Sequence, residues 1–213
     1  MSVQLLYFAN PMCSWCWGFA PSLDAVERRF GTAAPITLIL GSLGRGDRPM
    51  RDADKAVVRE HWEHVRDASG QPFDFAFFER EGFVYDTARP ARAVQAAREL
   101  APEAVLPLFH RLQHAFYALN RDVTDDAVLV ELAAAAGLDE AGFRERLGAP
   151  DRPERVEAEF ADTARLGVTG YPTMVGVAGG RAFPVTVGWR APADLVALLE
   201  PVVAAAAAQS GSV

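Results

Sequence analysis

The two cysteines of the chain, Cys13 and Cys16, stand three residues apart and place the strongest constraint on what it can fold into. The segment before them, Val3–Ala9, is short, apolar and aromatic, and predicts a buried strand. An Asn-Pro step then breaks the strand. Apolar residues at helical spacing predict a helix that begins at the first cysteine or at the next residue and runs to Phe30. The pair therefore stands where a strand ends and a helix begins.

The order of the remaining elements predicts how the chain is organised. They are a strand at Ile36–Leu40, a mainly helical block from about Asp52 to Gly167, strands at Thr173–Val177 and Ala182–Val187 around a Gly-Gly turn, and a helix at Ala191–Ala207. The sequence therefore predicts an α/β fold of order β-α-β, helices, β-β-α. We expect residues 1–48 and 166–213 to form one domain with a common sheet, and residues 49–165 to form an all-helical insertion.

The position of the cysteines predicts redox chemistry. Backbone amides in the first turn of a helix have no partner within the helix and carry a partial positive charge, which stabilises a thiolate. Residues three apart in that turn lie on the same side, so their sulfurs can close a disulfide. Cys13, at the exposed end, is the expected attacking sulfur. Cys16, one turn further in, is the expected resolving sulfur that releases the mixed disulfide.

Two other interpretations of the cysteines stay open on the sequence alone. Free cysteine is often buried, so the pair could simply be two neighbouring core thiols. A zinc site would need two more ligands. The histidine pairs at helical spacing, His61 with His64 and His110 with His114, are the candidates. Neither pair stands at zinc-finger distance from the cysteines, and a Cys-x-x-Cys pair in a βαβ setting is typical of redox function.

A proline far along the chain completes the pattern. Pro172 follows Tyr171 immediately before a predicted strand. A cis peptide bond here would be a specified feature, because only about 5% of such bonds are cis. An ordinary trans proline that opens an edge strand is the alternative, and the sequence does not separate the two.

Composition limits the partners and the location. The net charge of −7 argues against nucleic acid and anionic membranes as partners. The sequence has no apolar run of about 18 residues that would predict a membrane span, and its first residues are typical of a strand and not of a signal peptide. Two cysteines do not make a secreted disulfide framework. We therefore expect a cytoplasmic protein with no membrane association.

These motifs resemble those of the thioredoxin superfamily. The resemblance is carried by "CSWC" after the first strand, by the proline five residues later, and by "GYPT" before a hairpin. The helical block between the halves resembles the DsbA-like branch, in which a helical domain is inserted into the thioredoxin fold. "PMCSWCWGF", "RLQHAFYALNRDVTDD" and "LGVTGYPT" are similar to the FrnE-like group of bacterial disulfide isomerases.

The resemblance implies roles for four positions. Cys13 matches the nucleophile, Cys16 the resolving cysteine, and Pro172 a cis-proline that faces them. Tyr171, before that proline, matches the position whose backbone pairs with a bound peptide or thiol. An extended segment beside a thiol could also bind a substrate strand on purely physical grounds.

The residues between the cysteines depart from the strongly oxidising members of the family. Those members have a histidine there that stabilises the thiolate, whereas this chain has the uncharged Ser14 and Trp15. We therefore expect a less extreme redox potential, and we count both residues as substrate contacts. Trp17 is expected to pack in the core. The loop Tyr85–Pro90 is a weaker candidate for a wall of the substrate groove.

The leading hypothesis is a thiol:disulfide oxidoreductase or isomerase that acts on protein or small-molecule thiols through the Cys13–Cys16 pair. It requires neither metal nor organic cofactor, although glutathione could serve as a co-substrate. The alternative enzyme is a kappa-type glutathione transferase or a 2-hydroxychromene-2-carboxylate isomerase, although such enzymes commonly have serine at the nucleophile position. A metal-binding or partner-docking module is a third hypothesis. The direction of electron flow, the natural substrate and the oligomeric state do not follow from the sequence.

Overall fold

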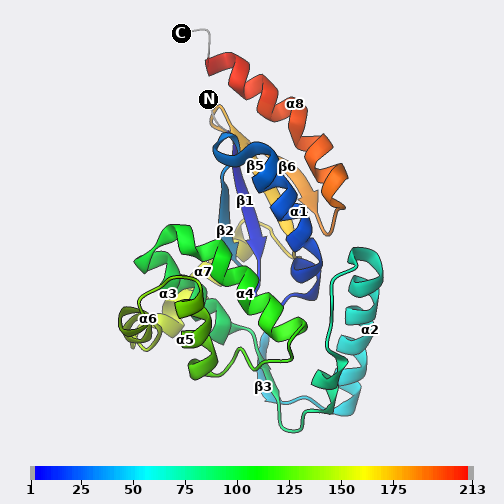
Figure 1. Ribbon diagram of the computed structural model, residues 1–213, viewed down its shortest axis with the longest axis vertical. Helices are drawn as coiled ribbons and strands as arrows, with labels where there is room; N and C mark the ends of the chain where they lie inside the picture. The colour runs from blue at the N-terminus through cyan, green and yellow to red at the C-terminus, as the bar shows by residue number, and fades with distance from the viewer. Residues whose placement is uncertain (1–2, 211–213) are drawn as a thin grey trace.

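The structure, a computed structural model, describes residues 3–210 and is built around a mixed four-stranded sheet (Figure 1). In the order in which they lie, the strands are β2 (Ile36–Leu40), β1 (Gln4–Ala9), β5 (Thr173–Ala178) and β6 (Arg181–Val187). β1 pairs in parallel with β2 and antiparallel with β5, and β5 pairs antiparallel with β6. Strands from both ends of the sequence therefore share one sheet, which confirms the predicted fold.

Helices cover this sheet and make up most of the middle of the chain (Figure 1). They are α1 (Ser14–Phe30), α2 (Asp52–Ser69), α3 (Ala88–Leu100), α4 (Val105–Tyr117), α5 (Asp126–Ala135), α6 (Glu140–Leu147), α7 (Arg152–Arg165) and α8 (Pro192–Ser210). Short 3-10 helices lie at Gly31–Ala33, Phe75–Glu79 and Pro102–Ala104. α1 packs against α8, while α7 lies against β2. Within residues 3–210, no helix combines the length and apolar character needed to cross a membrane.

The chain also holds a small antiparallel sheet across the predicted boundary at residue 48, with one strand mostly before that boundary and the other inside the segment predicted to be all-helical. It pairs β3 (Arg45–Pro49) with β4 (Val84–Asp86). The sequence of β3, "RGDRP", has no alternating apolar pattern by which a strand is recognised. Its backbone approaches β4 closely, and a Cβ atom at Gly46 would lie 2.7 Å from the carbonyl oxygen of Tyr85. Glycine therefore permits a pairing that side-chain pattern does not reveal.

The core beneath the cysteines joins β1 to α1. Leu5 and Tyr7 of β1 are fully buried, as are Phe19, Leu23 and Val26 of α1. The three α1 residues recur at the spacing that predicted this helix. Complete burial of an apolar side chain of this size contributes roughly 1.5–3 kcal/mol relative to exposure. The start of α1, which carries both cysteines, is therefore held on a rigid base.

A second core cluster fills the space between α2 and α4. The fully buried Trp62 of α2 is in ring contact with Phe77 and Phe78 at centroid distances of 4.9 Å, and with Tyr117 of α4 at 5.0 Å. The phenylalanine-rich stretch around residue 77 thus belongs to the core and not to a binding surface. This cluster fixes α2 relative to α4.

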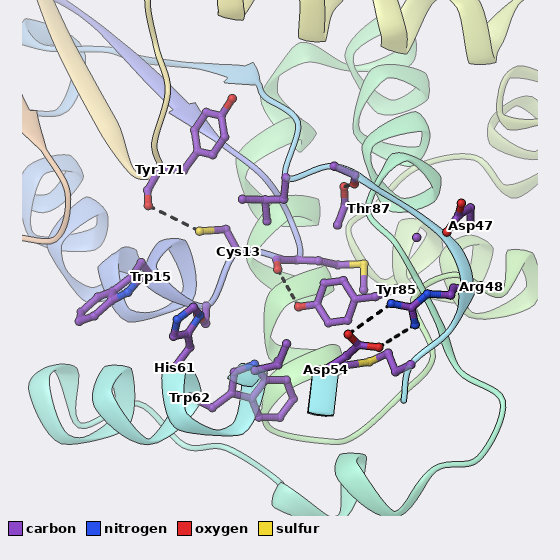
Figure 2. Close-up of a pocket in the computed structure, with 17 residues that line it drawn as sticks. Cys13, Trp15, Asp47, Arg48, Asp54, His61, Trp62, Tyr85, Thr87 and Tyr171 are labelled. Atoms are coloured by element: carbon purple, nitrogen blue, oxygen red, sulfur yellow. Dashed lines mark hydrogen bonds and ion pairs between the residues drawn. The ribbon is translucent and has the colours of Figure 1, made fainter. Parts of the chain in front are cut away.

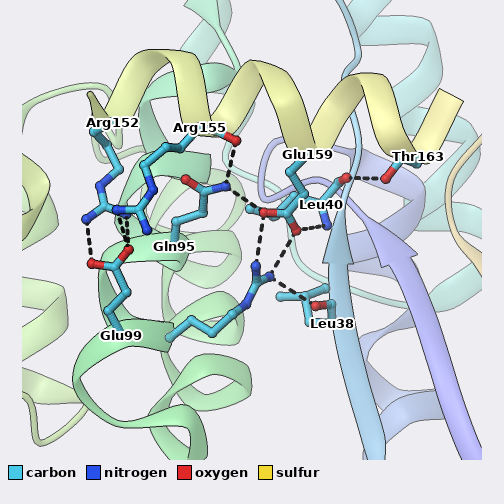
Figure 3. A network of polar contacts seen from close by, with 9 residues as sticks. Leu38, Leu40, Gln95, Glu99, Arg152, Arg155, Glu159 and Thr163 are labelled. Carbon is cyan, nitrogen blue, oxygen red and sulfur yellow. Dashed lines mark hydrogen bonds and ion pairs between the residues drawn. The ribbon is translucent and has the colours of Figure 1, made fainter. Parts of the chain in front are cut away.

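The outer edge of β2 is covered by polar side chains instead of another strand (Figure 3). Glu159 of α7 accepts a hydrogen bond from the backbone N–H of Leu40 at 2.9 Å, and Thr163 donates to the carbonyl oxygen of Leu40 at 2.7 Å. Arg98 of α3 donates to the carbonyl oxygen of Leu38 at 3.1 Å and pairs with Glu159 at 3.0 Å. A strand edge left open would be a template for aggregation. Here the same contacts fasten the helical segment to the sheet.

A buried arginine extends this network (Figure 3). Arg152 at the start of α7 is 1% exposed and donates two hydrogen bonds of 2.8 Å to the carboxylate of Glu99. Arg155 also pairs with Glu99 at 2.8 Å. These arginines lower the pKa of Glu99, chiefly through the hydrogen bonds from Arg152. The contacts join α3 to α7 and so stabilise the helical segment as a unit.

Candidate active site

The turn between β1 and α1 is organised by a buried asparagine. Asn10 accepts a hydrogen bond from the backbone N–H of Met12 at 2.9 Å and donates its side-chain amide to the carbonyl oxygen of Gly41 at 2.8 Å. Its own carbonyl oxygen accepts from the N–H of Cys13 at 3.1 Å. Cys13 is thereby held as the N-cap of α1, which begins at Ser14. The start of this helix agrees with the sequence prediction, which placed it at Cys13 or at the next residue.

The two cysteines have different access to solvent. Both are free thiols; Cys13 is 6% exposed and lines a cavity, whereas Cys16 is 0% exposed. The difference follows from their places in the helix, because the N-cap residue lies at the protein surface and the residue one turn on faces the sheet. A substrate can therefore reach Cys13 first.

The acidities of the two thiols differ in the same sense. The pKa of Cys13 is lowered, first by a hydrogen bond from the Cys16 thiol and also by the backbone amides of Cys16 and Trp15, against the opposing effect of burial. The pKa of Cys16 is raised well above its ordinary value, first by burial and then by its interaction with Cys13. The sulfur that borders the cavity is thus the better thiolate, and the one sealed behind it keeps its proton.

The loop before β5 brings Tyr171 and Pro172 to the cysteines. The Tyr171–Pro172 peptide bond is cis. The Cys13 thiol donates to the carbonyl oxygen of Tyr171 at 3.6 Å across 158 residues of sequence (Figure 2). This decides the question that the sequence left open, in favour of a cis-proline facing the pair. The Tyr171 ring lies against Gly41, where a Cβ atom would be 2.0 Å from the phenolic oxygen.

A cavity of about 540 Å³ opens beside Cys13 (Figure 2). Met12, Cys13, Ser14, Trp15 and Tyr171 form the wall nearest the thiol. These include four of the six site residues expected from the sequence. Cys16 and Pro172, both buried, lie behind that wall.

The opposite wall comes from α2 and the small sheet. Asp54, Val58 and His61 of α2 line the cavity, together with Tyr85 of β4 and Thr87 just after that strand (Figure 2). The predicted loop therefore does form part of the groove. The α2 residues were missed as pocket residues, and His61 was considered only as a zinc ligand. Within residues 3–210 there is no group of three or more His, Cys, Asp or Glu side chains that could hold a metal ion.

The two tryptophans that flank Cys16 lie in different environments, and Trp17 packs in the core as predicted. Trp15 is half-buried and lines the cavity. Trp17 is 6% exposed, stacks on Tyr117 and donates its indole N–H to the carbonyl oxygen of Pro72 at 3.0 Å. Trp17 is therefore a packing residue, and only Trp15 is available to a substrate.

An ion pair forms part of the cavity lining. Arg48 of β3 donates to the carboxylate of Asp54 at 2.6 Å, and the same carboxylate accepts from the backbone N–H of Arg51 at the start of α2 (Figure 2). The hydrogen bond from Arg48 and those from Arg51 hold the pKa of Asp54 well below its usual range. Asp47 adds an exposed carboxylate to the same lining. The cavity thus presents charges of both signs near an apolar floor.

Fold and site together define the class of this protein. The sheet order, the cysteine pair at the start of α1 and the cis-proline before β5 are those of a thioredoxin-fold thiol protein with added helices. The chain belongs to the DSBA-like thioredoxin domain family, whose profile matches residues 4–199. That family consists in general of thiol oxidoreductases.

Solved structures agree with this assignment over nearly the whole chain. A candidate protein disulfide isomerase from Nitrosomonas europaea is 32% identical, with a TM-score of 0.87 and coverage of 96% of this chain and 99% of that one. The cytosolic disulfide reductase DsbM from Pseudomonas aeruginosa is 30% identical, with a TM-score of 0.78 and coverage of 95% and 100%. DsbM has also been solved with GSH. A 2-hydroxychromene-2-carboxylate isomerase shares only the fold, at 15% identity and a TM-score of 0.63.

More distant relatives are longer proteins. The ClpXP adapter protein SpxH of Bacillus subtilis is 22% identical over 173 residues, which cover 81% of this chain and 57% of that protein. SpxH of Halalkalibacterium halodurans is 24% identical over 178 residues, covering 81% and 58%. The chain thus spans little more than half the length of these curated relatives.

Proposed function

We propose that this chain is a thiol:disulfide oxidoreductase in which Cys13 is the nucleophile and Cys16 the resolving thiol. The observation that carries the proposal is the asymmetry of the pair: Cys13 borders the cavity with a lowered pKa, whereas Cys16 is sealed beneath it with a raised pKa. Thiolate character at the sulfur that borders the cavity favours attack on a disulfide that enters that cavity. Because Cys16 keeps its proton, it becomes a nucleophile only after Cys13 has attacked, so it releases the product in a second step.

The exchange proceeds in two steps. The Cys13 thiolate attacks one sulfur of a substrate disulfide, which forms a mixed disulfide and expels the other sulfur as a thiolate. Cys16 then attacks Cys13, forms the Cys13–Cys16 disulfide and releases the second substrate thiol. Two electrons pass from the cysteine pair to the substrate. The carbonyl oxygen of Tyr171 lies beside the reacting sulfur, where an extended substrate backbone could pair with the cis-proline loop.

For the direction of transfer, we infer reduction or isomerisation of cytoplasmic disulfides. Ser14 and Trp15 between the cysteines carry no charge that would stabilise the Cys13 thiolate strongly. The DsbM relative, a cytosolic disulfide reductase at 30% identity over nearly its full length, supports this direction and location. We further propose that glutathione serves as a thiol co-substrate, since the cavity beside Cys13 is open and DsbM has been solved with GSH. In this proposal residues 49–165 act as an insertion that supplies, together with β3, the far wall of the cavity.

The proposal is tested by a redox titration. The purified protein is equilibrated in glutathione buffers of graded ratio, and the free thiols of Cys13 and Cys16 are counted by alkylation and mass spectrometry. We expect a reversible two-electron transition in the wild type and none in Cys13→Ser. Absence of any transition in the wild type would refute the proposal.

A second assay distinguishes the proposed oxidoreductase from the alternative enzyme class. A glutathione transferase or chromene-carboxylate isomerase needs no resolving thiol, so Cys16→Ala would retain full turnover. For an oxidoreductase, the same variant stops at the mixed disulfide. Undiminished glutathione-dependent turnover of an electrophile by Cys16→Ala would favour the alternative.

A further inference from the structure

A charged cluster on the far wall of the cavity takes no part in the exchange chemistry described above. It consists of Arg48 and Asp47 from β3 and of Asp54 from α2, which line the same cavity of about 540 Å³ as Cys13. Figure 2 shows Cys13 and Trp15 on one side of this cavity and the three charged side chains on the other. A few polar groups in such a pocket commonly fix the orientation of a ligand.

Tyr85 determines how far this cluster lies from the thiol. Its backbone belongs to β4, which pairs with β3. Its hydroxyl donates a hydrogen bond of 2.9 Å to the carbonyl oxygen of Met12, the residue before Cys13 (Figure 2). A single tyrosine side chain thus bridges the small sheet and the turn that carries the thiol. A small disulfide whose sulfur meets Cys13 can therefore reach the charged cluster with other groups of the same molecule.

Arg48 is oriented by its own contacts. It donates to the two carboxylate oxygens of Asp54 at 2.6 and 3.3 Å, and to the carbonyl oxygen of Pro49 at 3.1 Å. A guanidinium has five N–H donors, so these bonds within the described part of the chain do not use all of them. The Arg48 side chain is 49% exposed, and its remaining donors can bind a ligand in the cavity.

Asp54 does not neutralise Arg48 completely, because a second arginine shares its carboxylate. Arg51 donates to Asp54 from its backbone N–H at 2.9 Å and from its side chain at 3.3 Å. Two arginines thus face one carboxylate, which leaves a net positive charge on this group. Asp47 contributes a separate carboxylate to the same lining. A positive group with a carboxylate close by is complementary to an α-amino acid group, which carries one carboxylate and one ammonium.

We propose that this cluster binds the α-amino acid group of a small disulfide substrate, with Arg48 on the carboxylate and Asp47 on the ammonium, while Cys13 attacks the sulfur. The inference rests on the proposed function and makes Arg48 a residue that determines specificity. In the step concerned, the Cys13 thiolate bonds to one substrate sulfur, the substrate disulfide breaks, and the other half leaves as a thiolate. Oxidised glutathione carries an α-amino acid group in each half and serves as the probe.

The test compares two disulfides that differ in charge. Reduced protein is mixed with oxidised glutathione or with the uncharged hydroxyethyl disulfide, quenched with acid, and the loss of the free Cys13 thiol is followed by mass spectrometry. Arg48→Met keeps an apolar stem and removes the guanidinium. We expect Cys13 to react about fivefold more slowly with oxidised glutathione and at an unchanged rate with hydroxyethyl disulfide. Arg48→Lys, which keeps the charge but not the planar fork, should recover only part of the lost rate.

The ammonium contact is tested in the same assay with oxidised glutathione acetylated on both amino groups. This probe keeps the carboxylates and loses the two ammonium groups. We expect the wild type to react several-fold more slowly with it than with oxidised glutathione, and Asp47→Asn to show a smaller difference between the two probes. Equal rates in the wild type would overturn the assignment to an α-amino acid group.

Arg121→Met is the matched control. Arg121 also holds a carboxylate through two hydrogen bonds, to Glu131 at 2.7 and 2.6 Å, but it does not line this cavity. We expect its rates with both disulfides to equal those of the wild type. Equal slowing of both disulfides in Arg48→Met would overturn the inference, as would an unchanged rate with oxidised glutathione. A wild type whose Cys13 reacts with neither disulfide would instead overturn the proposed function, because the first step itself would be missing.

Discussion

The acidity of Cys13 depends on one neighbour that can be exchanged atom by atom. The Cys16 thiol is the leading cause that lowers the Cys13 pKa, through a hydrogen bond to its sulfur; burial opposes it, and the backbone amides of Cys16 and Trp15 add to it. Cys16→Ala removes the donor but leaves both amides in place. Cys16→Ser keeps a hydroxyl donor at the same position. The two variants differ in whether that hydrogen bond can form.

The expected size of the effect follows from two opposing terms. A hydrogen bond from a weak S–H donor to a thiolate is worth about 1.4 kcal/mol, which changes the thiolate fraction about tenfold at a pH below the pKa. A more basic thiolate is also more nucleophilic, with a Brønsted coefficient of about 0.4–0.5, so each thiolate of the alanine variant reacts about threefold faster. Cys16→Ala should therefore react about threefold more slowly than wild type at a pH below the Cys13 pKa of both proteins, and about threefold faster at a pH above both.

The assay is alkylation by iodoacetamide from mildly acidic to strongly alkaline pH, with Cys13 followed by peptide mass spectrometry. We expect the profiles of Cys16→Ala and wild type to cross, whereas the profile of Cys16→Ser should stay close to that of wild type. Crossing is the diagnostic feature, because a general loosening of the site would change the rate in one direction at every pH. Profiles that never cross, or a serine variant that behaves like the alanine variant, would refute the reasoning.

Two further predictions concern the scaffold of the site. Glu159→Ala leaves a backbone N–H of β2 and an arginine without their carboxylate, so the free energy of unfolding should fall by about 2–4 kcal/mol in urea titration. Glu131→Ala, which removes an exposed ion pair, should leave the midpoint nearly unchanged, and equal losses in the two variants would contradict this account. Gly41→Ala forces the Tyr171 ring to move and should lower the rate of Cys13 alkylation several-fold without a large loss of stability. Gly170→Ala, where a Cβ meets nothing within 4 Å, is its control, and equal rates in both variants would show that the ring position does not matter.

The parts of the site that follow local rules could be predicted from the sequence. An apolar strand, an Asn-Pro break and apolar residues at helical spacing place Cys13 at the start of α1, where the structure has it. A proline after Tyr171 and before a strand marks the facing loop, although only the structure shows the bond to be cis. The order of strands implied a shared sheet because the two halves would otherwise leave apolar strands unpaired.

The remaining parts depend on packing between segments that carry no local signal. The apolar face of α2 can be predicted from its sequence. The sequence does not indicate that Asp54 and His61 line the same cavity as Cys13. β3 pairs with β4 through backbone contacts that Gly46 permits, and its polar sequence hides this.

In the proposed exchange, the origin of the Cys13 thiolate also imposes an order on the two steps. The leading stabiliser of that thiolate is the Cys16 thiol, so the stabilisation exists only while Cys16 keeps its proton. Burial and the neighbouring Cys13 charge both raise the pKa of Cys16, which keeps it protonated as long as Cys13 is negative. Once Cys13 has formed a mixed disulfide, its charge is gone, and one of the terms that opposed ionisation of Cys16 goes with it. Cys16 then becomes able to attack because the first step has occurred. A site without a fixed cation between its cysteines can thus separate attack from release through hydrogen bonds and burial alone.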